Sequence, residues 1–330
     1  MSTPLPLGLA PYISPTTLVN APTGIDWSTL GDPTADPSPA QNMAEIWNMC
    51  GRATSRVDGY TNQVLRATAD VELLHGPDYR VTVGPASGGG YPTPYWGASA
   101  PQNARIILSR WPVLQVTGVK TCPNNVWPRS WTSVPSGYFE PEVPPIGIYG
   151  SVAPGGSAEG GQAILVGGGF INWSLNRNGW AIEVSYVNGY PHCSLSAACA
   201  AGDTTVSVND CTGWAISSFY GTYTGATGRV VDSGQQEAVH VTASSATAGP
   251  GTLTLSSPLH YPHEAGTLVT TMPSSIEQAC IYFAAAEALT RGATSTTIHA
   301  VGGAAQSSDK GAEDLIAEGE LLLHAFRRTI

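Results

Sequence analysis

The residues with the clearest potential for chemistry are histidines and cysteines in the second half of the chain. His192 and Cys193 are adjacent, Cys199 and Cys211 follow, and the segment His260-x-x-His263 adds two more imidazoles. Thiolates and imidazoles are ligands that Zn²⁺ prefers, so this is a candidate zinc set. Its spacing matches no standard zinc finger or zinc ribbon. We therefore expect no metal, and we interpret the last two histidines as part of a turn before a strand.

Sequence patterns for other kinds of chemistry are equally weak. Gly88-Gly-Gly and Gly167-Gly-Gly lack the lysine and hydroxyl residues of a phosphate-binding loop. The chain contains neither the GxSxG motif of hydrolases nor the HExxH motif of metalloproteases. Glu140 and Glu142 are a candidate acid pair, but they lie in a proline-rich segment without a helix or strand to fix their separation. The sequence predicts a protein that is not an enzyme and needs no cofactor.

The composition favours a structural protein with long ordered loops. Only 12% of the 330 residues are charged, whereas 38 are glycine and 26 are proline. Nine tryptophans and thirteen tyrosines argue against disorder, because disordered segments are poor in aromatic residues. The formal net charge of −10 disfavours direct binding of nucleic acid, but it is compatible with an acidic wall along which DNA passes.

The cysteine pattern and hydropathy bear on the compartment. The six cysteines are scattered without a CxxC motif, and Cys50 and Cys280 fall on predicted helix faces as small apolar residues. We find no secretory signal and no apolar run of the ~18 residues that a membrane span needs. We therefore expect a protein that is made in a cytoplasm and does not enter a membrane.

Two helices are predicted at the end of the chain. Ser274 with Glu277, and Ser275 with Gln278, have the spacing of two overlapping capping boxes, and apolar residues then recur at helical spacing over 273–291. A second amphipathic helix follows over 309–328, with acids early and arginines late, as the helix dipole favours.

The last helix carries the candidate interface and channel residues. We expect its apolar face to form the core of a helical bundle or a subunit interface, with its final basic residues beside it: Leu315, Leu322, Phe326, Arg327 and Arg328. Its acids form a second face that is solvated by default. If the molecule is a ring with this helix at the lumen, those acids line a channel: Glu313, Asp314, Glu318 and Glu320.

A third long helix is predicted near the start of the chain. It begins at Pro39, with Asp36 or Ser38 as its cap, and continues to about Thr68 with a moderately apolar stripe. This helix is the natural partner for the two at the end of the chain. The more than two hundred residues between them are then an insertion into a helical unit.

The remaining segments are predicted to be strands and loops. Residues 1–38 form an extended arm with one helical turn after Ser14, and we expect the arm to become ordered only on a neighbouring molecule. Residues 71–191 alternate as strands with long loops, and residues 192–272 carry five or six short strands, typical of a small barrel or sandwich. The predicted fold is α+β, in which a small helical core from 39–70 and 273–330 holds a large β-rich insertion.

This pattern resembles the head-to-tail adaptors of tailed bacteriophages. The resemblance rests on the stretch from Tyr12 to Trp27 before a helix through Tyr60, on the strand pair within 106–119, and on the proline-led helix 272–291 with a terminal helix after it. The β-rich insertion is larger than compact adaptors carry, which leaves its role open.

The resemblance implies a function in the virion. Adaptors commonly form twelve-fold rings beneath the portal protein, with a helical bundle as the ring-forming core. They extend the DNA channel without binding DNA specifically, and they dock stopper, tail-completion or tail-tube proteins. A protein of this kind is synthesised in the host bacterial cytoplasm and resides in the virion neck.

Two alternatives remain open. The chain is compatible with another virion structural protein, such as a tail-completion or capsid-decorating protein. A carbohydrate-binding or glycan-cleaving β protein is favoured only by the aromatic residues of 91–139, which include Trp127 and Trp131.

Overall fold

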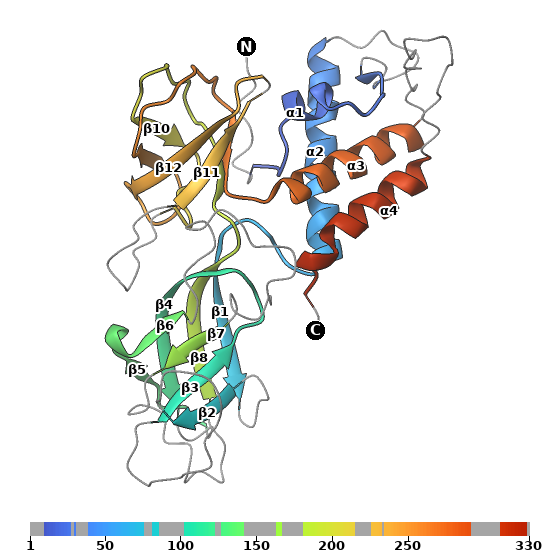
Figure 1. Cartoon of the computed structure of the whole chain (residues 1–330). Coiled ribbons are helices and arrows are strands. Elements are labelled where there is room, and N and C mark those ends of the chain that lie inside the picture. Colours follow the sequence, from blue (N-terminus) through green and yellow to red (C-terminus); the bar gives the residue numbers. More distant parts are fainter. Residues whose placement is uncertain are drawn as a thin grey trace. The chain divides into compact units, whose positions relative to one another are not determined.

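The computed structural model describes residues 10–27, 30, 39–75, 81–85, 102–122, 127–141, 163–166, 181–214, 226–232, 234–291 and 311–328. The protein is α+β, and its large middle part is β-rich, as predicted (Figure 1). Several predictions lie outside the described residues: the caps Asp36 and Ser38, both triple-glycine runs, Glu142 and the loop 293–307.

The chain divides into two compact units, and neither is continuous in sequence. Unit 1 comprises residues 1–65, 191–211 and 227–329, and unit 2 comprises residues 66–190 and 212–226. The short strands that we predicted as a separate module over 192–272 belong to the same compact unit as the helices.

Unit 1 contains a curled antiparallel sheet of six strands in the order β10-β13-β12-β11-β14-β9. A bridge between Leu195 and Val208 joins the two edges of this sheet, just beyond β9 and at the end of β10. The strands are β9 (His192–Ser194), β10 (Thr205–Val208), β11 (Ala226–Val231), β12 (Glu237–Ser244), β13 (Gly251–Leu255) and β14 (Leu268–Thr270).

Unit 1 also contains the helices, which come from both ends of the chain. The first is the short helical turn predicted there, and Ser14 caps it by accepting a hydrogen bond from the Thr17 N–H at 3.0 Å. The helices are α1 (Pro15–Asn20), α2 (Pro39–Thr61), α3 (Ser274–Thr290) and α4 (Ala312–Leu323), followed by a 3-10 turn, η4 (His324–Phe326).

Helix α2 ends earlier than the sequence predicted. Its last residue is Thr61, whereas the apolar spacing predicted a helix to about residue 68. Asn62 has a φ of 56°, the left-handed conformation at which many helices stop. Residues 68–75 form strand β1 of unit 2, so the predicted extension of the helical core to residue 70 is wrong.

Helix α3 begins where predicted, but without the predicted caps. Its N-cap is Pro273, and no side chain makes a capping hydrogen bond there. Glu277 instead forms an ion pair with Arg229 of β11 at 2.6 Å. The sheet therefore engages the carboxylate that the capping box required.

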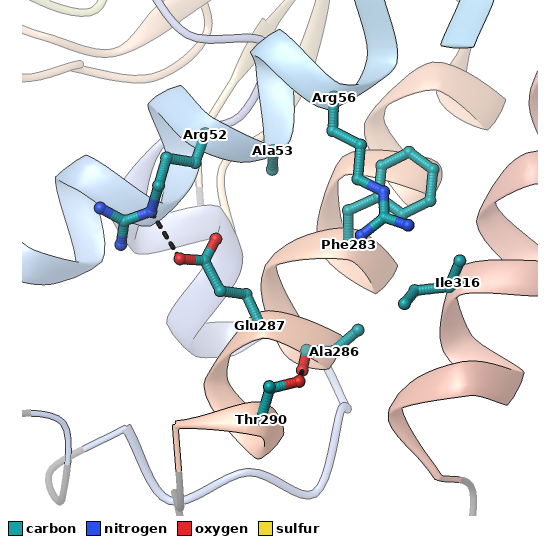
Figure 2. A pocket seen from close by; sticks show the side chains of 8 residues that line it. All are labelled: Arg52, Ala53, Arg56, Phe283, Ala286, Glu287, Thr290 and Ile316. Carbon is teal, nitrogen blue, oxygen red and sulfur yellow. Dashed lines mark hydrogen bonds and ion pairs between the residues drawn. The ribbon is translucent and has the colours of Figure 1, made fainter. Parts of the chain in front are cut away.

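Helix α3 packs against both α2 and α4, and most of its side chains are buried. Gly319 of α4 faces Phe283 of α3, and a Cβ atom at Gly319 would lie 2.6 Å from the phenyl ring. The guanidinium of Arg56 on α2 lies over the same ring, 4.8 Å from its centroid (Figure 2). One phenylalanine thus connects all three helices.

The described part of the N-terminal arm packs against other parts of the same chain. The Tyr12 N–H donates to the Thr54 hydroxyl of α2 at 2.9 Å, and the Tyr12 hydroxyl donates to Asp58 at 2.5 Å. The Leu65 N–H donates to the same tyrosine hydroxyl at 2.9 Å. The expectation that this arm is ordered only by a neighbour is therefore wrong for residues 10–27.

Unit 2 consists of two antiparallel four-stranded sheets. One has the order β1-β8-β4-β5, from β1 (Thr68–His75), β4 (Val113–Cys122), β5 (Thr132–Val134) and β8 (Ala181–Asn188). The other has the order β2-β3-β7-β6, from β2 (Val81–Pro85), β3 (Gln102–Ile107), β6 (Phe139–Pro141) and β7 (Ala163–Val166).

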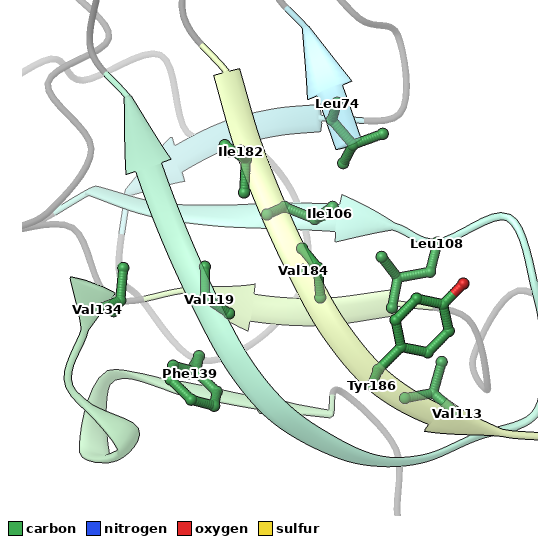
Figure 3. Close-up of a cluster of buried hydrophobic side chains, with 10 residues drawn as sticks. All are labelled: Leu74, Ile106, Leu108, Val113, Val119, Val134, Phe139, Ile182, Val184 and Tyr186. Atoms are coloured by element: carbon green, nitrogen blue, oxygen red, sulfur yellow. The ribbon is translucent and has the colours of Figure 1, made fainter. Parts of the chain in front are cut away.

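Ten buried side chains from both sheets form the core of unit 2 (Figure 3). Strand β8, which is paired on both sides, contributes Ile182, Val184 and Tyr186. Their spacing of two residues places them on one face of the strand. The alternation of residues along β8 therefore identifies the face of the strand that packs into the core of unit 2.

Candidate functional site

The helices of unit 1 form an open pocket of about 240 Å³. Its residues come from α2, α3 and α4 (Figure 2). The apolar lining includes Phe283 and Ile316, and the rim carries three charged groups, Arg52, Arg56 and Glu287. A pocket of this size accommodates one apolar side chain. Its charged rim favours polar groups next to that side chain on the partner.

A chain of ion pairs fixes one side of the pocket. Arg52 lies 2.7 Å from Glu45 and 2.6 Å from Glu287. Arg291 at the end of α3 pairs with both of these carboxylates. Burial raises the pKa of Glu45, but hydrogen bonds from Arg52 and Asn48 and the charges of the arginines outweigh it, so the pKa is lowered.

Arg56 is the more accessible cation of the rim. Its side chain is 45% exposed, and its nearest carboxylate, that of Glu320 on α4, lies 4.0 Å away. This separation is the limit of an ion pair, and exposed pairs of this kind contribute little to stability. Arg56 therefore retains charge that a partner can use.

The predicted core residues of the last helix occupy different environments. Leu315 is buried, whereas Leu322 and Phe326 are only half-buried. Leu323 is fully buried instead, so the innermost line of α4 is Leu315, Gly319 and Leu323, with a spacing of four residues. The sequence pattern contained these residues, but it did not distinguish the innermost line from its flank.

The two final arginines lie beside the end of α2. The Arg327 guanidinium lies over the Tyr60 ring, 5.5 Å from its centroid, and the Arg328 N–H donates to the Thr61 carbonyl at 2.9 Å. The Gln63 side chain also donates to the Phe326 carbonyl at 3.1 Å. These contacts fasten the end of the described chain to α2.

The four acids of α4 do not share one environment. Glu313 and Asp314 are exposed in the first turn, and Asp314 accepts a hydrogen bond from the Gly311 N–H at 3.1 Å. Glu318 and Glu320 are half-buried, and Glu320 faces Arg56. Leu321 was not singled out from the sequence, yet its exposed fraction is 76%.

A second polar centre lies within the curled sheet. The His263 side chain is fully buried, with Nδ1 3.0 Å from Asp232 and Nε2 2.8 Å from Glu237. His263 lies in the predicted turn before β14, but no pattern in the sequence pointed to its two carboxylate partners. Within the described ranges, no three histidine, cysteine, aspartate or glutamate side chains are arranged to hold a metal ion.

Backbone groups as well as His263 hold the Glu237 carboxylate. Burial raises the pKa of Glu237, but hydrogen bonds from the N–H groups of His260 and Tyr261 and from the His263 ring outweigh it and lower the pKa. Glu277 is the opposite case, because burial raises its pKa more than the adjacent Arg229 lowers it.

The two glutamates have opposite effects on acid stability. A lowered pKa means that the contribution of Glu237 is present above its unfolded-state pKa of ~4.3 and is lost as the pH falls through the folded-state pKa. Glu277 favours the folded state as the pH falls through its own raised pKa. Below pH 5, we expect the free energy of unfolding of Glu237→Gln to fall less steeply with pH than that of the parent protein. Urea unfolding at a series of pH values measures this. Unchanged pH dependence in this variant would contradict the assignment.

Two further observations bear on function. In the part of the chain that the structure describes, no helix has the length and apolar character to cross a membrane. Comparison with models of protein families, with curated proteins and with solved structures finds no match to this chain.

Proposed function

We propose that this chain is a structural virion protein, a head-to-tail adaptor that forms a ring under the portal protein of a tailed bacteriophage. The observation that carries the proposal is the make-up of unit 1. Helix α2 comes from near the start of the chain and α3 and α4 from its end, and they pack together across more than two hundred intervening residues. The adaptor resemblance implies this arrangement, and we assign the three helices as the bundle at the core of the ring.

Two unlike surfaces of α4 suit a head-to-tail contact between subunits. Leu321 is 76% exposed, and Glu318 lies one turn before it. Ile316 lines the pocket whose rim carries Arg52 and Arg56. A leucine next to an acid complements an apolar pocket beside the accessible Arg56 guanidinium, since Arg52 is already paired with Glu287. Unlike surfaces make heterologous contacts, which form a ring when the rotation closes. We assign Leu321 of one copy to the pocket of the next.

By analogy with the adaptor family, the ring has twelve subunits. It extends the DNA channel between the portal protein and a stopper, tail-completion or tail-tube protein. The net charge of −10 supports a wall from which the DNA backbone is repelled. Glu313 and Asp314 are the best candidates for this wall, since both are exposed. The protein then resides in the virion neck.

The subunit contact is tested by Leu321→Glu. We expect it to raise the concentration for half-maximal assembly about tenfold or more, because a buried leucine contributes about 1.5–3 kcal/mol and the glutamate adds a charge. Size-exclusion chromatography with mass measurement, and negative-stain imaging with and without portal protein, provide the readout. Leu73→Glu, at a 41% exposed leucine of β1, is the matched control.

The outcomes separate the alternatives. A protein that stays monomeric and never binds portal protein would overturn the adaptor proposal. Binding to the tail tube or capsid without portal binding would favour the alternative of a tail-completion or decoration protein. Rings that survive Leu321→Glu would refute only the assigned subunit contact.

A further inference from the structure

Unit 2 carries an aromatic cluster that the adaptor function does not use. In the segment Trp127-Pro-Arg-Ser-Trp131, the Arg129 guanidinium lies 5.7 Å from the Trp127 ring centroid and 5.9 Å from that of Trp131. Both distances are within the range of cation–π attraction. Strand β5 follows directly, pairs with β4 and places Val134 in the core of unit 2. The cluster is therefore attached to a fixed strand.

Trp127 is unusually accessible. Its exposed fraction is 86%, the highest among the exposed large apolar side chains of the described residues. Three other tryptophans, Trp27, Trp111 and Trp214, are at most 6% exposed. The cation–π contact with Arg129 restrains the Trp127 side chain. A ligand that stacks on the exposed indole therefore costs less side-chain entropy.

Arg129 is a cation without a carboxylate among the described residues. By contrast, Arg52, Arg110 and Arg229 all form ion pairs of 3.1 Å or less. A guanidinium presents paired N–H donors that match the oxygens of a carboxylate or phosphate. In a chain with a net charge of −10, an arginine that lies against two indole rings and has no acidic partner within the described ranges is suited to an external anion.

We infer that Trp127, Arg129 and Trp131 form a binding site for an anionic saccharide. The C–H face of a pyranose ring stacks on the exposed Trp127 indole, because polarised C–H groups are attracted to the negative face of an aromatic ring. A carboxylate or phosphate on that sugar accepts hydrogen bonds from the Arg129 guanidinium. The Trp131 ring, whose centroid lies 5.9 Å from the same guanidinium, restrains the cation.

Single-stranded nucleic acid is the competing ligand, since bases also stack on tryptophan and phosphates also bind arginine. The overall charge disfavours it, because affinity for nucleic acid depends strongly on neutralising several phosphates. One arginine supplies one such contact. A short acidic saccharide needs only one stacking face and one cation, which is what the cluster offers.

The test uses the full-length protein and isothermal titration calorimetry. Four probes of similar length are compared: an oligogalacturonate, a phosphorylated maltooligosaccharide, the neutral maltooligosaccharide and an oligothymidylate. We expect at least one anionic saccharide to bind about tenfold or more tightly than the neutral one. The carboxylate and phosphate probes distinguish the two sources of charge.

Variants assign the contacts. Trp127→Ala should weaken binding of the anionic saccharide about tenfold, Trp127→Tyr should retain most of it, and Arg129→Gln should remove the preference for charge. Tyr261→Ala removes a 45% exposed aromatic residue of unit 1 and should change nothing. Because Trp127 is so exposed, thermal unfolding of its variants should match that of the parent protein.

Three results would overturn the inference: no binding of either anionic saccharide, binding unaffected by Trp127→Ala, or tighter binding of oligothymidylate. Ring assembly is measured on the same variants. Since the cluster lies in unit 2 and the proposed subunit contact in unit 1, loss of one activity with retention of the other separates this inference from the adaptor proposal.

Discussion

Replacing His263 with alanine is expected to lower the free energy of unfolding by about 3–5 kcal/mol. The imidazole is fully buried between Asp232 and Glu237, with one ring nitrogen facing each carboxylate. The Glu237 side chain is only 5% exposed, so it cannot regain water when its partner is removed. Glu237 keeps the two backbone N–H donors of His260 and Tyr261 but loses its side-chain partner, and breaking a buried pair is among the costliest defects that a single substitution creates.

The measurement is urea unfolding followed by circular dichroism at pH 7. His260→Ala is the matched control, because His260 is exposed and only its backbone N–H contacts Glu237. Surface substitutions of this kind change stability by no more than about 0.5 kcal/mol. The double variant His263→Leu with Glu237→Leu should recover part of the loss, since apolar pairs often replace buried ion pairs without cost. Equal stability of His263→Ala and His260→Ala would disprove the assigned role.

This centre shows what sequence reasoning can and cannot supply. The turn that contains His263 was predictable from the prolines and glycine around it. Its partners were not, because Asp232 follows β11 and Glu237 begins β12, and it is the order β12-β11-β14 in the sheet that brings both to the turn before β14. Local patterns predict elements, whereas convergence of side chains from separate elements depends on tertiary structure.

The helices illustrate the same limit. Spacing of apolar residues predicted α3 and α4, but the predicted caps of α3 failed because Arg229, far away in sequence, engages Glu277. The prediction that α2 continues to about residue 68 was wrong, because the helix ends at Thr61 and residues 68–75 form a strand that pairs with β8. Four acids and two leucines of α4 were named from the sequence, but Leu321 was not, because its exposure follows only from the side on which α3 lies.

Replacing Gly319 with valine is expected to destabilise the protein by about 3 kcal/mol, near the upper end for overpacking a well-filled core. A Cβ at this position lies 2.6 Å from the Phe283 Cε1 atom and within 3.1 Å of two further ring atoms. The ring is 2% exposed and lies under the Arg56 guanidinium, so it can yield only by moving into the pocket that it lines and displacing that cation. Valine at position 319 therefore disturbs this contact or separates α3 from α4.

Gly51→Ala provides the control that isolates this contact. A Cβ at Gly51, also within a helix, meets no atom within 4 Å. Alanine there should stabilise the protein by up to about 1 kcal/mol through helix propensity alone. Gly319→Ala gains the same propensity but loses more by displacing the ring, so the two alanine variants should change stability in opposite directions, as measured by thermal and urea unfolding.

The pair of Gly319 and Phe283 should also be energetically coupled. Phe283→Leu alone leaves a gap and is destabilising, but in the Gly319→Ala background the smaller side chain relieves the clash, so the two effects should not add. Additive effects, or a stabilising Gly319→Ala, would show that α4 is not held against α3 by this contact. Because Ile316 and Leu321 are placed by the same helix, a displaced α4 should also weaken ring assembly, whereas Gly51→Ala should leave assembly unchanged.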